Sequence, residues 1–443
     1  NSSIYENTVA VGAVLGMLGM DLEVYERVIE RVFLKKKPEV VEINKKAARA
    51  GYSYAKEKCL ACKFVVPKAE KKNTILINGN QAIGLGALVS GLRFYSAYPM
   101  TPSTGIMNYI ASRAEEFGVV VEQAEDEIAA INMALGASFA GVRAMTGSSG
   151  GGFALMVEGV SLAGMTETPI VIAEVQRPGP ATGLPTRTEQ ADLLFVLYAG
   201  HGEFPKVVFA PGTPEECFYL TNLAFDITER FQVPVFILSD QYLADSQWSI
   251  PEFDKNKLIY RDYRIKDAPS QYRRHAITNS GISPLAIPGE GQYLVVTDSD
   301  EHDEEGHIIE DAETRIKMVQ KRLHMKLPQL KEEALEPKYL GPERPDVVLL
   351  CWGSTYGVVR EVSEATGTGM LHFSQVWPIA LKDNWLSILR EARKVIAVEQ
   401  NATGQFARLL RSETSFQVDE IITKYDGRPF LYEELLEEVK KRI

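Results

Sequence analysis

The sequence contains little cysteine and no excess of basic charge, and each shortage excludes a class of protein. Its 443 residues include only four cysteines, too few for a disulfide framework in a chain of this length. Lys and Arg total 48 against 59 Asp and Glu, a formal net charge of −11. Proteins that bind nucleic-acid phosphates carry a basic footprint. We therefore predict a soluble cytoplasmic enzyme that does not bind nucleic acid.

Long hydrophobic runs are also missing. The longest apolar run near the start, TVAVGAVLGMLGM, is too short and too rich in glycine to span a bilayer. Acidic residues follow it and no basic segment precedes it, so it is not a signal peptide. We expect no membrane association. Asn1 in place of Met fits a chain that begins inside a longer gene product, and a trimmed chain would look the same.

Two motifs for phosphate and cluster binding are absent. The glycine-rich stretch TGSSGGGFALM lacks the Gly-Lys-Ser/Thr ending of a P-loop. A cubane iron–sulfur cluster needs four thiolates, but only Cys59 and Cys62 lie close together, and Cys217 and Cys351 are distant. We expect no cluster in this chain alone. Cys59 and Cys62 are a chance pair, a redox pair or half of a shared site, and we favour chance.

The hydrophobic pattern changes along the chain. Residues 5–35 and 44–57 have helical periodicity, and from residue 74 short apolar strands alternate with helices, as in a parallel sheet with helices on both faces. Residues 255–340 are irregular and charged and end in a helix. We therefore divide the chain as follows: a short N-terminal segment, 1–66; a linker, 67–73; a large α/β domain, 74–254; a connector, 255–340; and a smaller α/β domain, 341–443.

The stretch YPMTPSTG at 98–105 is predicted to be a rigid loop at a strand end. Its two prolines cannot continue a central strand. Thr101, Ser103 and Thr104 place three hydroxyls there. They either cap the following helix or hold a ligand. We expect Ser103 or Thr104 to cap, and Thr101 to be free for a ligand.

Four acids follow the strand in VVVEQAEDEIAAINMALGASFAG: Glu122, Glu125, Asp126 and Glu127. The helix is expected to begin at about Glu125. Acids in a first helical turn are favoured by the helix dipole, so these residues have an ordinary structural explanation. The small and apolar residues that follow predict a buried helix, however. A carboxylate at the carboxyl end of a parallel strand is then a candidate for proton chemistry.

Two further loops follow predicted strands. In TGSSGGGFALM, Gly147 and Ser148 lie where a backbone can approach a ligand closely, although a plain glycine turn is as well supported. The loop RPGPATGLPTRTEQADL carries Arg177 and Arg187, which fit an anionic substrate with one or two carboxylates, or a solvated surface loop. Because the loops follow parallel strands, we expect all four to converge on one edge of the sheet.

Taken together, these motifs resemble a known family. YPMTPST, EQAEDEIAA, TGSSGGGFALM and RPGPATGLPTRTEQ are similar to the α subunit of 2-oxoacid:ferredoxin oxidoreductases, the 2-oxoglutarate (2-oxoglutarate synthase) type above all. The resemblance runs from about residue 74 to the C-terminus, and residues 1–66 resemble the tail of a fused γ domain. It implies a thiamine-diphosphate-enzyme pyrimidine-type doubly wound domain, followed by a smaller transketolase-C-terminal-like α/β domain.

The resemblance also implies residue roles. Glu127 corresponds to the glutamate that hydrogen-bonds N1′ of the cofactor aminopyrimidine, with Gly147 and Ser148 beside the cofactor. Thr101 belongs to the substrate-side loop. Arg177 and Thr186 correspond to groups that hold the substrate carboxylate, and Thr182 lies beside them. Arg187, the second arginine of the loop, is expected to select a distal carboxylate.

The implied reaction is oxidative decarboxylation of 2-oxoglutarate with coenzyme A, giving succinyl-CoA and CO2, with electrons passed to ferredoxin. Thiamine enzymes bind diphosphate and Mg²⁺ through a Gly-Asp-Gly followed by Asn, and this sequence has no Gly-Asp-Gly. A β subunit is therefore expected to carry that motif and a [4Fe-4S] cluster, in a dimer of heterodimers.

Several alternatives remain open from the sequence. The substrate could be pyruvate, a branched-chain 2-oxoacid or a broad range of 2-oxoacids. A coenzyme A ligase or transferase subunit and a non-catalytic scaffold are more distant readings. The stretch DSDEHDEEGH, with His302 and His307, could bind a metal, but a solvated acidic loop is the favoured interpretation.

Overall fold

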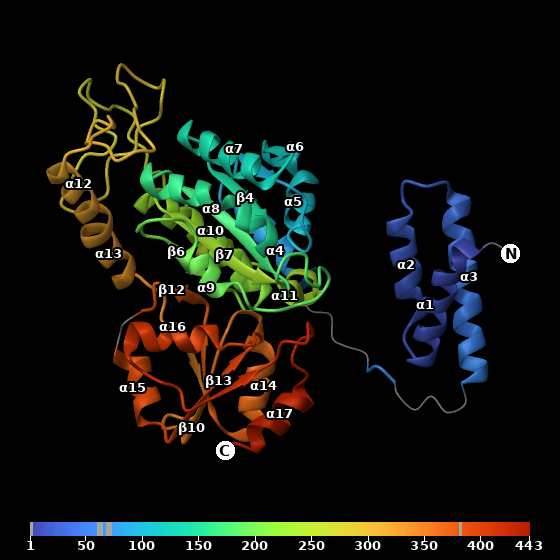
Figure 1. Ribbon diagram of the computed structural model, residues 1–443. Coiled ribbons are helices and arrows are strands. Elements are labelled where there is room, and N and C mark those ends of the chain that lie inside the picture. Colours follow the sequence, from blue (N-terminus) through green and yellow to red (C-terminus); the bar gives the residue numbers. More distant parts are fainter. Residues whose placement is uncertain (1–2, 60–64, 68–72, 381–382) are drawn as a thin grey trace. The chain divides into compact units, whose positions relative to one another are not determined.

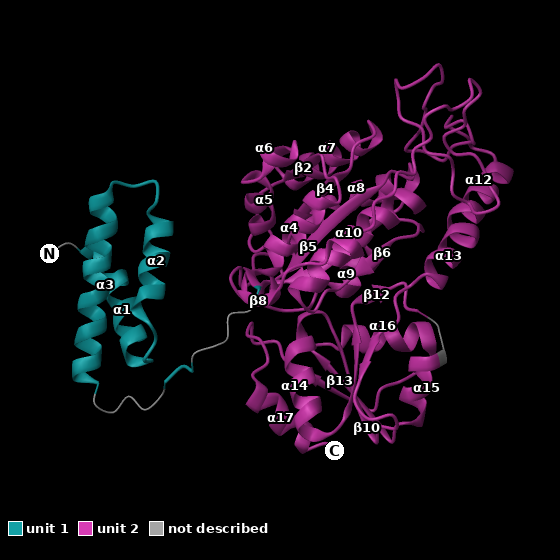
Figure 2. Ribbon diagram, turned by 180° about the vertical axis from the view of Figure 1, so that it is seen from behind, with its two compact units in different colours: residues 1–73 teal, residues 74–443 magenta. Residues whose placement is uncertain are grey.

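The computed structural model describes residues 3–59, 65–67, 73–380 and 383–443. The chain forms two compact units, residues 1–73 and 74–443 (Figure 2). Each unit is described by itself below.

The first unit is helical. Its described residues form a 3₁₀ turn, η1 (Ser3–Tyr5), and three helices: α1 (Glu6–Met17), α2 (Leu22–Val32) and α3 (Pro38–Lys58). The predicted continuous helix at 5–35 is interrupted, because Asp21 accepts a hydrogen bond from Glu23 N and begins a new helix. Glycines let α1 and α3 approach closely: a Cβ at Gly16 would lie 2.6 Å from the Tyr52 carbonyl oxygen.

The centre of the second unit is a mostly parallel sheet. Seven strands of the described chain form it, in the order β12-β6-β7-β5-β4-β2-β3, and only β12 runs antiparallel to its neighbour. The strands are β2 (Phe94–Ala97), β3 (Val120–Gln123), β4 (Ala144–Ser148), β5 (Ile170–Gln176), β6 (Val207–Phe209), β7 (Pro234–Asp240) and β12 (Gln375–Trp377).

Helices cover both faces of this sheet (Figure 1). On one face, α4, α5 and α10 pack against alternate strand residues such as Tyr95, Met145 and Val171. On the other face, α7, α8 and α9 pack against the residues between them, such as Ala144 and Ile172. The alternation follows from the two-residue repeat of a strand, and the doubly wound α/β fold is the predicted one. The helices are α4 (Gly79–Val89), α5 (Thr104–Ala111), α6 (Ala114–Phe117), α7 (Glu127–Phe139), α8 (Gly150–Met165), α9 (Leu193–Tyr198), α10 (Pro214–Phe231) and α11 (Gln241–Asp245).

A second, smaller sheet lies in the C-terminal part of the same unit. Its described strands have the order β14-β13-β10-β11-β9, with β9 antiparallel to β11 and the others parallel. The elements are β9 (Lys338–Leu340), β10 (Val347–Trp352), η4 (Gly353–Thr355), α14 (Tyr356–Thr366), β11 (Gly369–Phe373), α15 (Asp383–Glu391), β13 (Lys394–Glu399), α16 (Gln405–Thr414), β14 (Glu420–Thr423) and α17 (Tyr432–Lys440). One hydrophobic core runs from α8 and α9 into α16 and β10, so the two sheets share an interior.

The connector between the sheets has little regular structure. Strand β8 (Trp248–Pro251) pairs with β1 (Thr74–Ile77), and η2 (Lys255–Lys257) follows. Beyond a long irregular stretch, α12 (Ala312–Val319) continues through a π-helical turn, η3 (Gln320–Lys326), into α13 (Leu327–Glu332). Two strands pair with the sheet on the other side of the predicted boundary at residue 340. Strand β9, placed in the connector, belongs to the second sheet, and β12, placed in the smaller domain, completes the first.

Candidate functional site

Four strand-end loops meet at the carboxyl edge of the first sheet. The strands β5, β4, β2 and β3 are consecutive neighbours in this sheet, so the loops that follow them lie side by side. The chain leaves β2 for β3 on one side and returns to β4 on the other, and such a switch point is where open α/β sheets place ligands. Met100 after β2 and Ser148 at the end of β4 meet there, with 3.8 Å between Sδ and Oγ.

Glu127 is the first residue of α7, at the centre of this edge. Asp126 caps the helix by accepting a hydrogen bond from Ala129 N at 2.7 Å. The helix therefore begins at Glu127 rather than at Glu125, because Asp126 has the extended backbone of a cap. The Glu127 side chain is 3% exposed, and its Oε1 has no hydrogen-bond partner among the described residues. Burial, followed by the nearby Asp126 carboxylate, raises the pKa of Glu127.

Helix α7 is buried on one side and exposed on the other. Ile128 is half exposed, and Asn132 and Gly136 are also exposed. The prediction of a fully buried helix is therefore wrong for one side. The burial of Glu127 comes from its position against the neighbouring helix α8.

The turn after β4 brings the α8 backbone close to Glu127. A Cβ at Gly152 would collide with both the Glu127 carboxylate and the Ser148 hydroxyl, so glycine lets α8 approach these two buried polar groups. Gly147 has a different role in the protein itself. A Cβ there would lie 2.7 Å from the Tyr95 hydroxyl, so Gly147 makes room for a tyrosine inside the sheet.

The loop at 98–105 contains no side-chain cap. Ser103 is the N-cap residue of α5, but its hydroxyl donates to the Met100 carbonyl at 2.8 Å and makes no capping bond. Thr104 is already the first helical residue. The predicted capping by Ser103 or Thr104 is therefore wrong, since the cap backbone is helical rather than extended. Thr101 is exposed, and its carbonyl accepts a hydrogen bond from Arg177 Nη1 at 2.6 Å.

The arginine loop divides into a fixed root and an exposed tip. Arg177, at the start, is partly buried and contacts the Thr101 loop. Thr182, Thr186 and Arg187, in the tip, are exposed. The structure therefore brings Arg177 to Thr101, and it places the other three on the surface of the same loop.

Sequence reasoning missed a group of buried acids behind this loop. Glu174 lies inside β5 with no exposure, and neither of its carboxyl oxygens has a hydrogen-bond partner among the described residues. Burial, together with the neighbouring acids Asp192 and Asp240, raises the pKa of Glu174 well above its usual range. Burial raises the pKa of Asp192 to about 6. The signal was available, because Glu174 interrupts an apolar strand, IVIAEVQ.

The acidic stretch at 298–307 is not wholly solvated. His302 is fully buried, and its ring contacts that of His275 with centroids 3.9 Å apart and planes tilted by 45°. Glu301 forms ion pairs with Arg315 and Arg322. Among the described residues, no group of three or more His, Cys, Asp or Glu is placed to hold a metal ion. Cys62 lies outside the described residues, so the role of the Cys59 and Cys62 pair stays a prediction, whereas Cys217 and Cys351 are buried free thiols.

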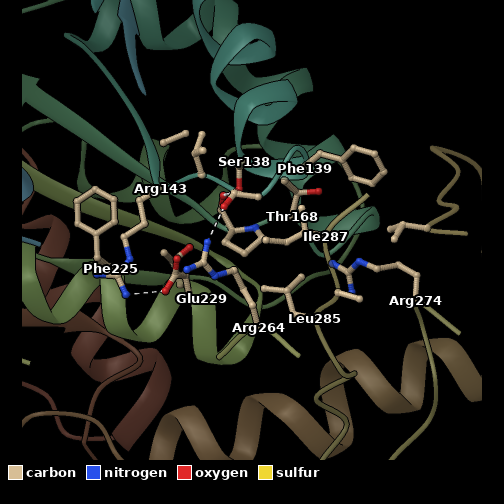
Figure 3. Close-up of a pocket in the computed structure, with 17 residues that line it drawn as sticks. Ser138, Phe139, Arg143, Thr168, Phe225, Glu229, Arg264, Arg274, Leu285 and Ile287 are labelled. Carbon is tan, nitrogen blue, oxygen red and sulfur yellow. Dashed lines mark hydrogen bonds and ion pairs between the residues drawn. The ribbon is translucent and has the colours of Figure 1, made fainter. Parts of the chain in front are cut away.

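A well-enclosed cavity of about 30 Å³ lies at the other end of the first sheet (Figure 3). Ala144, the first residue of β4, lines it, whereas Ser148 is the last residue of that strand. The Arg143–Glu229 ion pair, with 2.6 Å between Nη2 and Oε2, forms part of the wall. The volume suits one or two water molecules, so the cavity is not the ligand site.

Family comparison matches most of the chain. The model described as "Pyruvate flavodoxin/ferredoxin oxidoreductase, thiamine diP-bdg" matches residues 86–321, and "Pyruvate ferredoxin/flavodoxin oxidoreductase" matches residues 1–54. The fold and the first of these models define a thiamine-diphosphate-binding α/β enzyme subunit. None of the helices in the described part of the chain is long and apolar enough to cross a membrane.

Individual relatives narrow the family. The 2-oxoacid:ferredoxin oxidoreductase 1 subunit alpha of Sulfurisphaera tokodaii is 37% identical, over 99% of this chain and 72% of the relative. The 2-oxoglutarate oxidoreductase subunit KorA of Mycobacterium tuberculosis is 33% identical, over 97% and 67%. A solved 2-oxoglutarate:ferredoxin oxidoreductase from Magnetococcus marinus, with 2-oxoglutarate, coenzyme A and succinyl-CoA bound, has a TM-score of 0.92 at 34% identity, covering 99% of this chain and 77% of that one. The chain belongs to the 2-oxoacid:ferredoxin oxidoreductases, as an α subunit.

The carboxyl edge fits the pyrimidine end of thiamine diphosphate. An aminopyrimidine ring needs an acid at N1′, and Glu127 offers a buried carboxyl oxygen without a partner in the described chain. Gly152 places the α8 backbone against Glu127 and Ser148, where any side chain would collide with both. The diphosphate end has no counterpart here, because the sequence contains no Gly-Asp-Gly.

Proposed function

We propose that this chain is the α subunit of a 2-oxoglutarate:ferredoxin oxidoreductase. The enzyme converts 2-oxoglutarate and coenzyme A to succinyl-CoA and CO2 and passes two electrons, one at a time, to ferredoxin. A β subunit supplies the Gly-Asp-Gly…Asn motif, Mg²⁺ and the [4Fe-4S] cluster, and the holoenzyme is a dimer of heterodimers. Residues 1–66 are the tail of a γ-type domain.

The observation that carries the choice of substrate is the arginine loop. Arg177 is fixed beside Thr101, and Arg187 lies exposed in the tip of the same loop. A dicarboxylate such as 2-oxoglutarate offers one carboxylate to each guanidinium, and arginine binds carboxylates in a bidentate manner. A 2-oxoacid with an apolar tail has no group for the second arginine.

Glu127 is the catalytic residue of this chain. Thiamine diphosphate, when bound, supplies the carbanion chemistry that releases the 2-oxoacid carboxyl group as CO2. Glu127 holds the pyrimidine ring through its free Oε1, with Ser148 and Gly147 beside the cofactor. Burial raises the pKa of Glu127, so its carboxyl group holds a proton more readily than that of an exposed glutamate. Arg177, Thr101, Thr182 and Thr186 hold and orient the reacting carboxylate.

The test compares two substrates in the α–β holoenzyme. Replacing Arg187 by alanine removes a charge-assisted contact with the distal carboxylate, so we expect kcat/KM for 2-oxoglutarate to fall about 10- to 100-fold. The value for 2-oxobutyrate should change less than about twofold. Reduction of ferredoxin is the readout.

Arg411→Ala is the matched control, because Arg411 is an exposed arginine in the last turn of α16. Arg411→Ala should leave kcat/KM unchanged for both substrates. Equal losses for both substrates in Arg187→Ala would remove the selective role of Arg187. Faster turnover of pyruvate or a branched-chain 2-oxoacid by the unmodified enzyme would favour the broad-range alternative.

A further inference from the structure

Three buried amide side chains join the arginine loop to the smaller α/β domain. Gln190 lies at the root of the loop, and Gln400 and Asn401 follow β13 in the smaller domain. Gln190 and Asn401 have no exposure and Gln400 is 2% exposed. We call these three residues the amide cluster.

The amide cluster forms a reciprocal set of hydrogen bonds across the domain boundary. Gln190 N donates to the Gln400 carbonyl at 2.7 Å, and Gln400 N donates to Gln190 Oε1 at 3.4 Å. Asn401 Nδ2 donates to the Gln190 carbonyl at 3.1 Å, and Gln190 Nε2 donates to the Trp352 carbonyl at 3.1 Å. Both the main chain and the side chain of Gln190 are therefore held by the smaller domain.

A tight turn of the smaller domain lies beneath the loop tip. Gly427 accepts a hydrogen bond from Thr188 N at 3.2 Å, and Gln400 Nε2 donates to the neighbouring Arg428 carbonyl at 2.8 Å. A Cβ at Gly427 would lie 3.0 Å from Leu184 Cδ1 and 3.1 Å from Arg187 Cβ. The backbone of Gly427 thus supports the stem of Arg187, and its φ of +79° favours glycine.

Side-chain hydrogen bonds from the larger domain hold the root of the loop. Asp192 N donates to Gln176 Oε1 at 3.0 Å, and the Thr188 hydroxyl donates to Asp240 Oδ1 at 3.3 Å. Two hydrogen bonds lie within the tip itself, from Leu184 N to the Pro178 carbonyl and from Arg187 N to the Leu184 carbonyl. The position of the tip relative to Thr101 therefore depends on the support from the smaller domain.

Buried hydrogen bonds fix the position of the loop against the domain more strictly than apolar packing does. Buried amides must be matched donor to acceptor, and each unmatched group costs about 1–3 kcal/mol, so the amide cluster admits one register of loop against domain. Apolar packing tolerates small shifts at much lower cost. Substrate-binding groups lose efficiency when displaced by about 1 Å.

We propose that the smaller α/β domain positions the substrate loop, with the amide cluster fixing the loop root and Gly427 setting the reach of Arg187. Gln190, Gln400 and Asn401 are positioning residues, and Gly427 is a specificity-determining position. The role of Gly427 rests on the proposed function, whereas the role of the amide cluster requires only that the loop binds the 2-oxoacid.

The first experiment tests the amide cluster in the α–β holoenzyme. Gln190→Met keeps the side-chain volume and removes the side-chain bonds to Gln400 N and the Trp352 carbonyl. Gln400→Met likewise removes the side-chain bond to the Arg428 carbonyl, and the double variant combines the two changes. With the 2-oxoacid that the holoenzyme turns over best, we expect each single variant to raise KM about fivefold or more, and the double variant to add little, because both break one joint. Gln417→Met, an exposed amide of the same domain, is the control and should leave KM unchanged.

A purely structural role gives a different result. It lowers the thermal midpoint of the variants and leaves KM of the folded enzyme at the unmodified value, and that outcome overturns the proposal. Additive increases in KM also overturn it, since independent sites do not form one joint.

The second experiment uses Gly427→Ala, which pushes on Arg187 and replaces no residue of the amide cluster. We expect KM for 2-oxoglutarate to rise about tenfold and KM for 2-oxobutyrate to stay within about twofold. In an Arg187→Ala background, the effect of Gly427→Ala on 2-oxoglutarate should disappear. Equal effects on both substrates in an enzyme that prefers 2-oxoglutarate overturn the role of Gly427.

The two experiments separate the two proposals. An enzyme that does not use 2-oxoglutarate, but whose KM responds to Gln190→Met and Gln400→Met, contradicts the proposed substrate and supports the amide cluster. An enzyme that is selective for 2-oxoglutarate, but whose KM is unchanged in those variants, supports the proposed substrate and contradicts the role of the amide cluster.

Discussion

Two buried glutamates occupy similar places in the two sheets, and their surroundings differ. Glu127 follows β3 and begins α7, whereas Glu399 ends β13 and faces the start of α16. Glu399 accepts hydrogen bonds from Phe406 N and Ala407 N, both at 2.8 Å, and from Asn401 Nδ2 at 2.9 Å. Glu127 has an oxygen without a partner in the described chain.

The contrast distinguishes a structural carboxylate from a ligand-binding one. A buried acceptor that the protein satisfies holds the chain together, whereas one that the protein leaves unsatisfied costs stability and is available to a bound molecule. Both glutamates have the same chemistry and a similar helix-start setting, so residue type alone does not separate them. The hydrogen bonds that each carboxylate accepts distinguish the two glutamates.

The largest expected effect comes from Glu127→Gln. It keeps the shape and removes the proton exchange at the pyrimidine ring, so kcat of the holoenzyme should fall by about 10²- to 10⁴-fold. Circular dichroism should remain that of the unmodified protein. Glu125→Gln, an exposed acid two residues earlier, is the control and should retain full turnover. Unimpaired turnover in Glu127→Gln would contradict the catalytic assignment.

The same substitution should have opposite effects on stability at the two sites. Glu399→Gln places an amide donor against N–H donors and should cost about 1–3 kcal/mol, seen as a lower thermal midpoint. Glu127→Gln should raise the midpoint at pH 7 in the cofactor-free protein, because it removes a poorly solvated charge. A raised folded-state pKa means that stability from Glu127 is present below its unfolded pKa of about 4.3 and is lost as pH rises. The gain from Glu127→Gln should therefore vanish at low pH.

If both variants shift the thermal midpoint in the same direction at pH 7, the distinction between a structural and a ligand-binding carboxylate is contradicted. A gain in Glu127→Gln that persists below pH 4 would show that relief of charge is not its cause.

A smaller effect is expected at Thr101. Thr101→Val removes the hydroxyl and keeps the carbonyl that accepts from Arg177. Loss of one hydrogen bond to substrate is worth about 1 kcal/mol, so KM should rise about fivefold with little change in stability. Thr104→Val, the same change inside α5, should not alter KM. If the two variants behave alike, Thr101 has no substrate contact.

The sequence was sufficient to predict the convergence of four loops, because parallel strands fix where their carboxyl ends lie. It also placed Glu127 among four candidate acids at the start of an apolar helix, and the family resemblance then singled out Glu127. Capping was predicted wrongly at Ser103, because its backbone is helical and its hydroxyl donates to the Met100 carbonyl instead. The contacts of Gln190 with Gln400 and Asn401 could not be predicted, since residues 210 positions apart meet only through the packing of two domains.

Strand β12 has a consequence for synthesis of the chain. It pairs with β6 although the two are far apart in sequence, with Gln375 opposite Phe209. Residue 377 must therefore leave the ribosome before β12 can pair with β6 and complete the first sheet. Until then, β6 exposes unpaired backbone groups that can pair with other chains. A gene cut near residue 340 would produce a larger domain with a permanently open edge, so the two domains are expected to be expressed well only as one polypeptide.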